Sequence, residues 1–233
     1  MKRGDLSIIK FFVEELGVNI HHEEHQKRNV IYLGSCEGNL DVVKYLHQKG
    51  CDINKQSSLG RTPLSKACYL GQVEVVEYLL SHKADFTLKD HKERSPLHNA
   101  AWGRQGGRDG KKRGDQLVDD SPESVELLLK AGHPIDVIDC DGFTPFFSSV
   151  SSNGARSFQL LINRGANIRH LTKKGENACL VAAKYGHLDL LRCLVEQHNC
   201  DINLRDSYGI SALEAAAILD YDKPTEQHEF AIQ

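Results

Sequence analysis

The 233-residue chain lacks any uninterrupted apolar run long enough to cross a bilayer, so we expect no membrane-spanning segment. It also lacks a large excess of charge of one sign. Lysine and arginine number 29 against 32 aspartates and glutamates, which leaves a formal net charge of -3. This balance excludes a strong overall attraction to polyanions. We therefore expect neither a membrane nor, as the main partner, a nucleic acid.

Cysteine motifs are missing as well. The seven cysteines are odd in number, and no two of them form a C-x-x-C pair. This argues against a disulfide framework and against a zinc ribbon. The short apolar patch near the N-terminus is broken by Lys10 and followed by Glu14, which is not the pattern of a secretory signal. We expect an intracellular protein, in the cytoplasm or nucleus, that holds no metal and no cofactor.

Short sequence marks recur along the chain at a nearly constant distance. The segment Thr62-Pro63-Leu64-Ser65 is followed 33 residues later by Ser95-Pro96-Leu97-His98. Similar segments begin at Thr144, Asn177 and Ser211. The interval before Thr144 is 49 residues, so one unit carries about 16 additional residues. Most units also contain a second apolar segment with a glycine on each side. Gly38 and Gly50 are such a pair.

These marks resemble the ankyrin repeat, a unit of about 33 residues with a β-turn and two antiparallel helices. The resemblance covers nearly the whole chain and implies an all-α solenoid, in which helix-turn-helix pairs are joined by β-turn fingers, as one domain over residues 1–233. We count seven units. The first (about 4–17) and the last (from Tyr208) are partial, and the complete ones are 26–58, 59–91, 92–140, 141–173 and 174–207.

Capping chemistry predicts the same helices independently. Thr62, Ser95 and Thr144 are good N-caps, and the proline after each occupies a position where a missing N–H costs nothing. Glycine stands at the C-terminal end of most second helices, where a left-handed residue is favoured. Lys83 takes that place in the third unit, so we expect a left-handed lysine at a cost of roughly 1 kcal/mol.

A solenoid of this family presents turn tips and first-helix side chains on one face. The resemblance therefore implies a non-catalytic scaffold or adaptor that binds another protein or peptide on its concave face. We expect a monomer with no small-molecule substrate. The family's exposed positions give the predicted partner-binding residues Arg61, Lys66, Tyr69, Lys92, Arg94, Asn99, Trp102, Phe143, Lys184 and Tyr185.

Aromatic and basic side chains alternate among these positions. Trp102 is the only tryptophan, and aromatic residues dominate interface energetics, so it is the first candidate for a binding hot spot. The alternative is that Trp102 packs beneath the neighbouring insertion. Cations beside Tyr69, Trp102 and Tyr185 favour an acidic or extended peptide, although each lysine can also serve only to keep the face solvated.

An insertion at 103–120 separates the two helices of the fourth unit. Its glycine and charge content cannot bury a core, so we expect a mobile loop. The loop either tolerates insertion passively or contacts nucleic acid or an acidic partner through its basic residues Arg104, Arg108, Lys111, Lys112 and Arg113. A further alternative is that the repeats are the targeting or autoinhibitory arm of a larger enzyme.

Two weaker patterns suggest chemistry. The stretch from Leu46 to Asn54 resembles substrates of an ankyrin-directed asparaginyl hydroxylase, which makes Asn54 a candidate for modification. The alternative is structural, because asparagine in such a turn hydrogen-bonds the backbone. His21 and His25 would share one face of a helix, but the segment does not match H-E-x-x-H. We interpret it as solvated charge.

Overall fold

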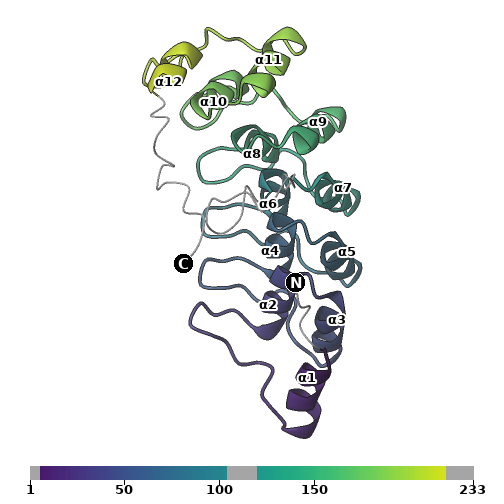
Figure 1. Cartoon of the computed structure of the whole chain (residues 1–233). Helices are drawn as coiled ribbons and strands as arrows, with labels where there is room; N and C mark the ends of the chain where they lie inside the picture. The colour runs from purple at the N-terminus through teal and green to yellow at the C-terminus, as the bar shows by residue number, and fades with distance from the viewer. Residues whose placement is uncertain (1–5, 104–119, 219–233) are drawn as a thin grey trace.

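The computed structural model describes residues 6–103 and 120–218, and every regular element in these two ranges is a helix. The helices pair into antiparallel hairpins that stack into an elongated solenoid (Figure 1). The first helix of each unit lies in an inner column and the second in an outer column. Loops project beyond the inner column as fingers (Figure 1). The predicted all-helical repeat solenoid is confirmed.

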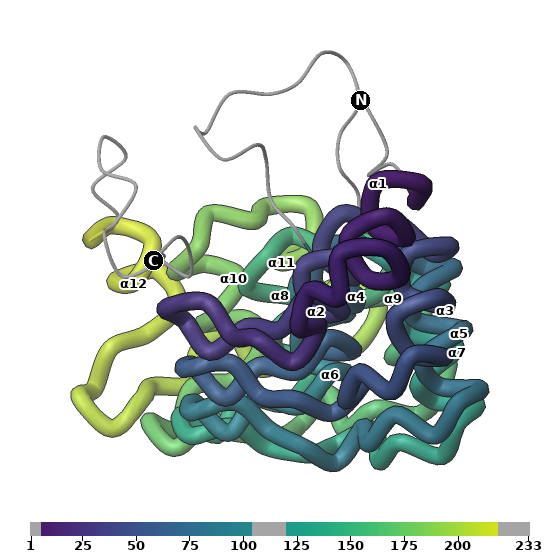
Figure 2. The backbone as a smooth tube through the Cα atoms, turned by 90° about the horizontal axis from the view of Figure 1, so that it is seen from below, coloured from purple at the N-terminus to yellow at the C-terminus, as the bar shows by residue number. Residues whose placement is uncertain are grey.

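Each complete unit contributes a short inner helix and a longer outer one. The inner column consists of α2 (Val30–Glu37), α4 (Pro63–Tyr69), α6 (Pro96–Trp102), α8 (Pro145–Ser151), α10 (Ala178–Lys184) and α12 (Ala212–Ile218). The outer column consists of α1 (Leu6–Lys10) with η1 (Phe11–Glu15), then α3 (Leu40–Gln48), α5 (Val73–Ser81), α7 (Pro122–Lys130), α9 (Ala155–Asn163) and α11 (Leu188–Glu196). Viewed along the stack, α3, α5 and α7 lie together on one side of the inner helices (Figure 2). Within the described residues, no helix has both the length and the apolarity to span a bilayer.

The inner helices begin at the predicted caps. The Thr62 hydroxyl accepts a hydrogen bond from the Ser65 amide at 3.1 Å, and Pro63 takes the first helical position. The Thr144 hydroxyl accepts from the Phe147 amide at 3.4 Å in the same way. These bonds satisfy donors that a helix start otherwise leaves without an intrahelical partner.

A continuous apolar core runs between the two columns. The inner helices contribute small residues such as Ala67 and Ala100, whose size lets neighbouring helices approach closely. The outer helices from α3 to α11 contribute one fully buried leucine each at the equivalent position: Leu46, Leu79, Leu128, Leu161 and Leu194. Adjacent inner helices pack against one another along the whole stack. Because each hairpin is covered only by its neighbours, the stability of the solenoid depends on contacts between units.

Backbone hydrogen bonds link successive fingers. In each finger one amide donates to a carbonyl of the preceding finger. The bonds are Ser58 to Gln26 (2.7 Å), His91 to Leu59 (3.1 Å), Cys140 to Lys92 (3.0 Å), Lys173 to Asp141 (3.0 Å) and Ser207 to Lys174 (2.8 Å). We call this series the finger ladder. It holds the fingers in register even across the unit that carries the insertion.

Two local irregularities have simple causes. Lys83 adopts the expected left-handed backbone with φ of 64°, in the place that Gly50, Gly132 and Gly165 occupy elsewhere. The first unit has one residue more between Leu6 and Gly17 than the next has between Leu40 and Gly50. The π-helical turn η1 accommodates this extra residue.

The buried His98 side chain connects two units. Its Nδ1 accepts hydrogen bonds from the Ser95 amide (3.2 Å) and hydroxyl (2.9 Å), and its Nε2 donates to the Phe143 carbonyl at 2.9 Å. Both ring nitrogens are therefore engaged in the neutral form. Burial lowers the pKa of His98 to about 4.

We predict that this depressed pKa makes stability depend on pH. The stabilisation from neutral His98 is complete above the unfolded value of about 6.5 and is lost as the pH falls toward 4, by about 3 kcal/mol in total. Burial also lowers the pKa values of His133 and His187, which adds to the effect. Urea denaturation between pH 7 and pH 4.5 should show the decline, and His98→Gln should flatten it. His91→Gln, at an exposed finger position, is the matched control. An unchanged pH profile in His98→Gln would contradict the prediction.

Candidate functional site

One side-chain oxygen organises each finger turn at the same place in the unit. It accepts a hydrogen bond from the amide four residues further along the chain. The pairs are Glu24 with Arg28 (3.2 Å), Ser57 with Arg61 (3.2 Å), Asp90 with Arg94 (3.1 Å), Asp139 with Phe143 (2.8 Å), Thr172 with Glu176 (3.2 Å) and Asp206 with Ile210 (2.9 Å). The second residue of each pair therefore has an equivalent position on every finger.

Three consecutive fingers carry arginine at that second position. Arg28, Arg61 and Arg94 are spaced 33 residues apart, and we call them the arginine ladder. Arg28 pairs with Glu24 of its own finger at 2.7 Å. Arg94 likewise pairs with Asp90, through Nε at 2.9 Å and a terminal nitrogen at 2.6 Å. The outer two arginines thus fold back onto a local carboxylate.

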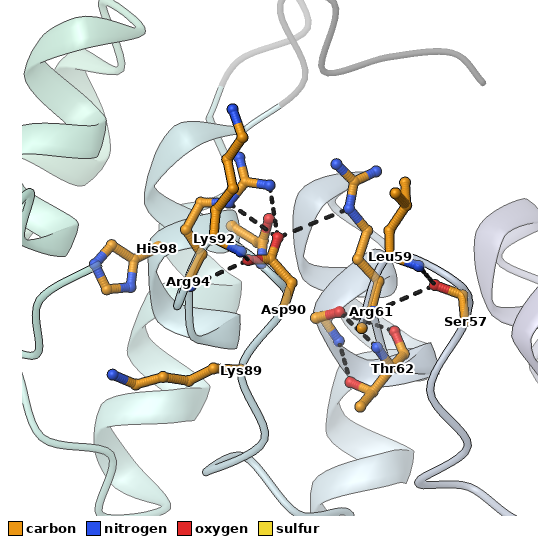
Figure 3. Close-up of polar contacts among 12 residues, drawn as sticks. Ser57, Leu59, Arg61, Thr62, Lys89, Asp90, Lys92, Arg94 and His98 are labelled. Carbon is orange, nitrogen blue, oxygen red and sulfur yellow. Dashed lines mark hydrogen bonds and ion pairs between the residues drawn. The ribbon is translucent and has the colours of Figure 1, made fainter. Parts of the chain in front are cut away.

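The middle arginine has no carboxylate in its own turn because Ser57 stands in the acidic position. The Arg61 Nε instead lies 3.9 Å from the Asp90 carboxylate of the next finger (Figure 3). Asp90 is therefore shared between two guanidinium groups. Its side chain is almost fully buried, as is much of both arginines.

Two guanidinium groups lie beside the one carboxylate of Asp90. Burial lowers the pKa of Arg94, and the hydrogen bonds and charge of Asp90 act against that effect. Arginine stays charged at neutral pH, so two guanidinium charges face one carboxylate. The exposed Lys92 side chain extends to the same side as Arg94 and Arg61 (Figure 3). Guanidinium and ammonium groups are donors whose charge-assisted hydrogen bonds suit carboxylates.

The other predicted site residues lie in the inner helices or next to them. Lys66 places its Nζ 4.7 Å from the centre of the Tyr69 ring, a cation–π contact. Phe143 is half-buried, with its ring 5.8 Å from that of Phe147. Trp102, the last residue of α6, is half-buried as well. Aromatic and basic side chains are therefore close together in the third unit.

In the sixth unit the predicted cation is already partnered. Lys184 forms an ion pair with the buried Glu176 at 2.9 Å. Burial acts to lower the pKa of Lys184, but the hydrogen bond and charge of Glu176 outweigh it and raise the pKa. Burial raises the pKa of the neighbouring Tyr185. The Tyr185 ring stacks on that of His187, with 6.2 Å between the ring centres. This end of the face is less available to an added anion.

The expected exposure of two site residues is wrong. Arg94 is buried because its side chain turns inward to Asp90. Asn99 is buried because its amide nitrogen donates to the Ser95 carbonyl at 3.1 Å, within the first turns of α6. Arg28, by contrast, belongs to the arginine ladder although the sequence analysis did not select it. The 33-residue spacing from Arg61 and Arg94 was the signal for it.

The predicted basic loop residues Arg104, Arg108, Lys111, Lys112 and Arg113 lie outside the described residues. Of the insertion 103–120, the structure describes only its two ends. Gly103 and Asp120 are both buried there. The Asp120 carboxylate accepts a hydrogen bond from the Ser157 amide in α9. The end of the insertion is thus tied to the following unit.

Asn54 has a structural contact between units. Its side-chain oxygen accepts a hydrogen bond from the Asp85 backbone amide at 2.8 Å. Its own backbone amide donates to the Asp52 carboxylate at 2.8 Å. These bonds match the structural alternative for Asn54, and its hydroxylation stays a prediction. In the histidine-rich segment, His21 and His25 are exposed. The described parts of the chain hold no group of three or more metal-ligating side chains.

Comparison with known proteins adds independent information. A family model described as ankyrin repeats (3 copies) matches residues 1–90, 31–107, 117–206 and 149–223. The ankyrin repeat domain of human ASB11 superposes with a TM-score of 0.71, covering 91% of this chain and 86% of that domain. At 23% identity this likeness supports the fold alone.

Curated relatives match the chain over part of their lengths. Alpha-latroinsectotoxin-Lt1a of Latrodectus tredecimguttatus is 29% identical over 229 residues, which is 95% of this chain and 15% of the toxin. From Arabidopsis thaliana, the serine/threonine-protein kinase VIK is 32% identical over 65 residues (28% of this chain, 15% of the kinase). The E3 ubiquitin-protein ligase KEG is 29% identical over 104 residues (43% of this chain, 6% of the ligase). The chain therefore spans 15% or less of the length of these relatives.

We predict that Asp90 stabilises the cluster through its charge. Asp90→Asn keeps an oxygen for the Lys92 and Arg94 amides but removes the carboxylate that both guanidinium groups share. Leaving the buried Arg94 without a counter-charge should lower the free energy of unfolding by about 3 kcal/mol. Urea denaturation measures this loss. Glu93→Gln, an exposed acidic position in the same finger, is the control, and equal losses in the two variants would contradict the prediction.

Proposed function

Because the chain belongs to the ankyrin-repeat family, a general protein-interaction module, we propose that it is a non-catalytic scaffold or adaptor that binds another protein on its concave face. The binding region extends over the fingers and inner helices of the third to sixth units. The observation that carries the proposal is the arginine ladder, which extends the region into the second unit. In it, Arg28 pairs with Glu24, and Arg61 and Arg94 both lie beside Asp90.

We propose further that the partner presents an extended acidic segment. The ladder repeats once per unit, so a peptide running along the stack would meet the partly exposed Arg28 and Arg61 in turn, while the buried Arg94 acts through its charge. A carboxylate suits the forked geometry of a guanidinium group, and Lys92 adds charge that steers the encounter. Tyr69 and Trp102 lie on neighbouring inner helices and supply apolar surface for a hot spot. Together these groups favour alternating acidic and apolar residues in the partner.

A second candidate is that these repeats form a targeting or autoinhibitory arm of a larger enzyme. The matches to VIK and KEG favour it, since each covers a small part of a kinase or a ligase. Sequencing the full-length transcript separates the two candidates. A reading frame that continues into a catalytic domain would favour the arm, and one that does not would favour the independent adaptor.

We propose a reducing, intracellular location for this binding. All seven cysteines lie in the described ranges and none is in a disulfide. Cys140 is exposed on a finger. In an oxidising compartment such a thiol would be open to unwanted pairing.

We predict that binding depends on the charge of the finger face. The probe is a fluorescein-labelled peptide of alternating glutamate and leucine, followed by fluorescence anisotropy. Lys92→Glu should weaken binding about tenfold, because it reverses a charge at the ladder. Lys130→Glu reverses a charge on the outer helix α7 and should leave affinity unchanged. Equal losses in both variants would contradict the proposal.

Trp102→Ala in the same titration tests the hot spot. Truncation of an aromatic residue at the centre of an interface should weaken binding about tenfold or more. An unchanged affinity would show that Trp102 is not part of the binding site. The proposed role of charge would then be judged from the Lys92→Glu and Lys130→Glu variants alone.

A further inference from the structure

The sixth unit places cysteines at two core positions that recur in every complete unit. Cys179 is the second residue of α10 and is fully buried. Cys200 follows α11, and its backbone amide donates to the Leu194 carbonyl at 3.0 Å. The Ala84 amide donates to the Leu79 carbonyl in the same way in the third unit. The earlier units hold these pairs at the two positions: Ile31 with Cys51, Leu64 with Ala84, Leu97 with His133, and Phe146 with Ala166. Among the complete units, only the sixth has two thiols there.

A side-chain hydrogen bond ties the two positions together. The Asn177 side-chain amide, at the start of α10, donates to the Asp201 carbonyl at 2.6 Å. Asn177 lies two residues before Cys179, and Asp201 directly follows Cys200. The bond therefore holds the start of α10 beside the turn that follows α11. Cys179 belongs to the apolar core, and the half-buried Cys200 packs against it.

The two thiols also contact each other. They share a hydrogen bond, which lowers the pKa of the Cys200 thiol. Burial acts against this effect, and the backbone amide of Cys179 adds to it. The same hydrogen bond raises the pKa of the Cys179 thiol, and burial raises it further. Because the thiolate is the nucleophilic form of cysteine, Cys200 is the attacking thiol of the pair and Cys179 is the second thiol.

We propose that Cys179 and Cys200 are a redox pair, which a hydroperoxide converts into a reversible disulfide within the chain. The Cys200 thiolate attacks one oxygen of hydrogen peroxide, and the O–O bond breaks. Cys200 becomes a sulfenic acid, and the hydroxide that leaves takes up the proton that Cys200 had lost. The Cys179 sulfur then attacks the Cys200 sulfur, the S–O bond breaks, and a second water leaves with the Cys179 proton. Two thiols and one peroxide thus yield one disulfide and two waters.

This modification fits the proposed reducing location, where both thiols are free at rest and a thiol such as glutathione reverses the disulfide. The disulfide joins the start of α10 to the turn after α11, so it closes the hairpin of the sixth unit. Closing this loop restricts the unfolded chain, and the oxidised protein should unfold at a higher urea concentration than the reduced protein. The pair lies in the core of one unit, so the proposal is independent of partner binding on the finger face.

Peptide mapping of the full chain after treatment with hydrogen peroxide tests the proposal. Free thiols are blocked with iodoacetamide, and the protein is digested with trypsin without a reductant. Mass spectrometry should find peptide 175–184 linked to peptide 193–205, and dithiothreitol should separate them. The second peptide contains Cys193 as well as Cys200. Cys193→Ser is therefore the matched control and should keep the link, whereas Cys200→Ser should lose it.

Two further variants test the order of the steps. In Cys179→Ser the second thiol is absent, so Cys200 should stop at the sulfenic acid, which dimedone captures. Cys179→Ala replaces this variant if circular dichroism shows that it does not fold. Cys140→Ser removes an exposed thiol and should form the link as the wild type does.

Three results would each overturn the proposal. They are a wild type without the link, a link that persists in Cys200→Ser, and a link that is lost in Cys193→Ser. Absence of a dimedone adduct on Cys200 in a folded Cys179 variant would contradict the assignment of Cys200 as the attacking thiol.

Discussion

Contact between neighbouring units is the constraint on which the whole molecule depends. A hairpin such as α4 with α5 is too small to bury its own apolar faces, so Leu64 and Leu79 are covered only when units stack. The finger ladder adds one backbone hydrogen bond between each pair of successive fingers. His98 adds a side-chain bond from one unit to the next. Stability, shape and binding surface all follow from this repetition.

The candidate site follows from the same repetition, with one substitution that changes its chemistry. An acceptor at a fixed place in each finger positions the residue four places later, and in three fingers that residue is arginine. Ser57 replaces the acidic acceptor in the middle finger, so Arg61 is directed toward Asp90 of the next unit. One buried carboxylate then balances two guanidinium groups. This arrangement needs residues of two neighbouring units and is not found within any single repeat.

Much of this structure could be predicted from the sequence because the repeat signals are local. The cap at Thr62 and the left-handed Lys83 each depend on a few neighbouring residues. The burial of Arg94 could not be predicted in this way, because it depends on whether a carboxylate in the same finger turns toward it. Asn99 was misjudged for a similar reason, since its amide finds a carbonyl within its own helix. The exposed positions expected from the family are averages over many repeats. A side chain that finds a hydrogen-bond partner nearby can be buried at such a position.

Native-state hydrogen exchange tests most directly whether contact between units holds the molecule together. The account predicts that the finger amides of His91 and Lys173, which lie outside any helix, exchange as slowly as amides within α4 and α6. Protection should then fall toward α1 and α12, which lie at the two ends of the described stack and pack there against a unit on one side only. Rapid exchange at His91 and Lys173, or equal protection from α1 to α12, would contradict the account.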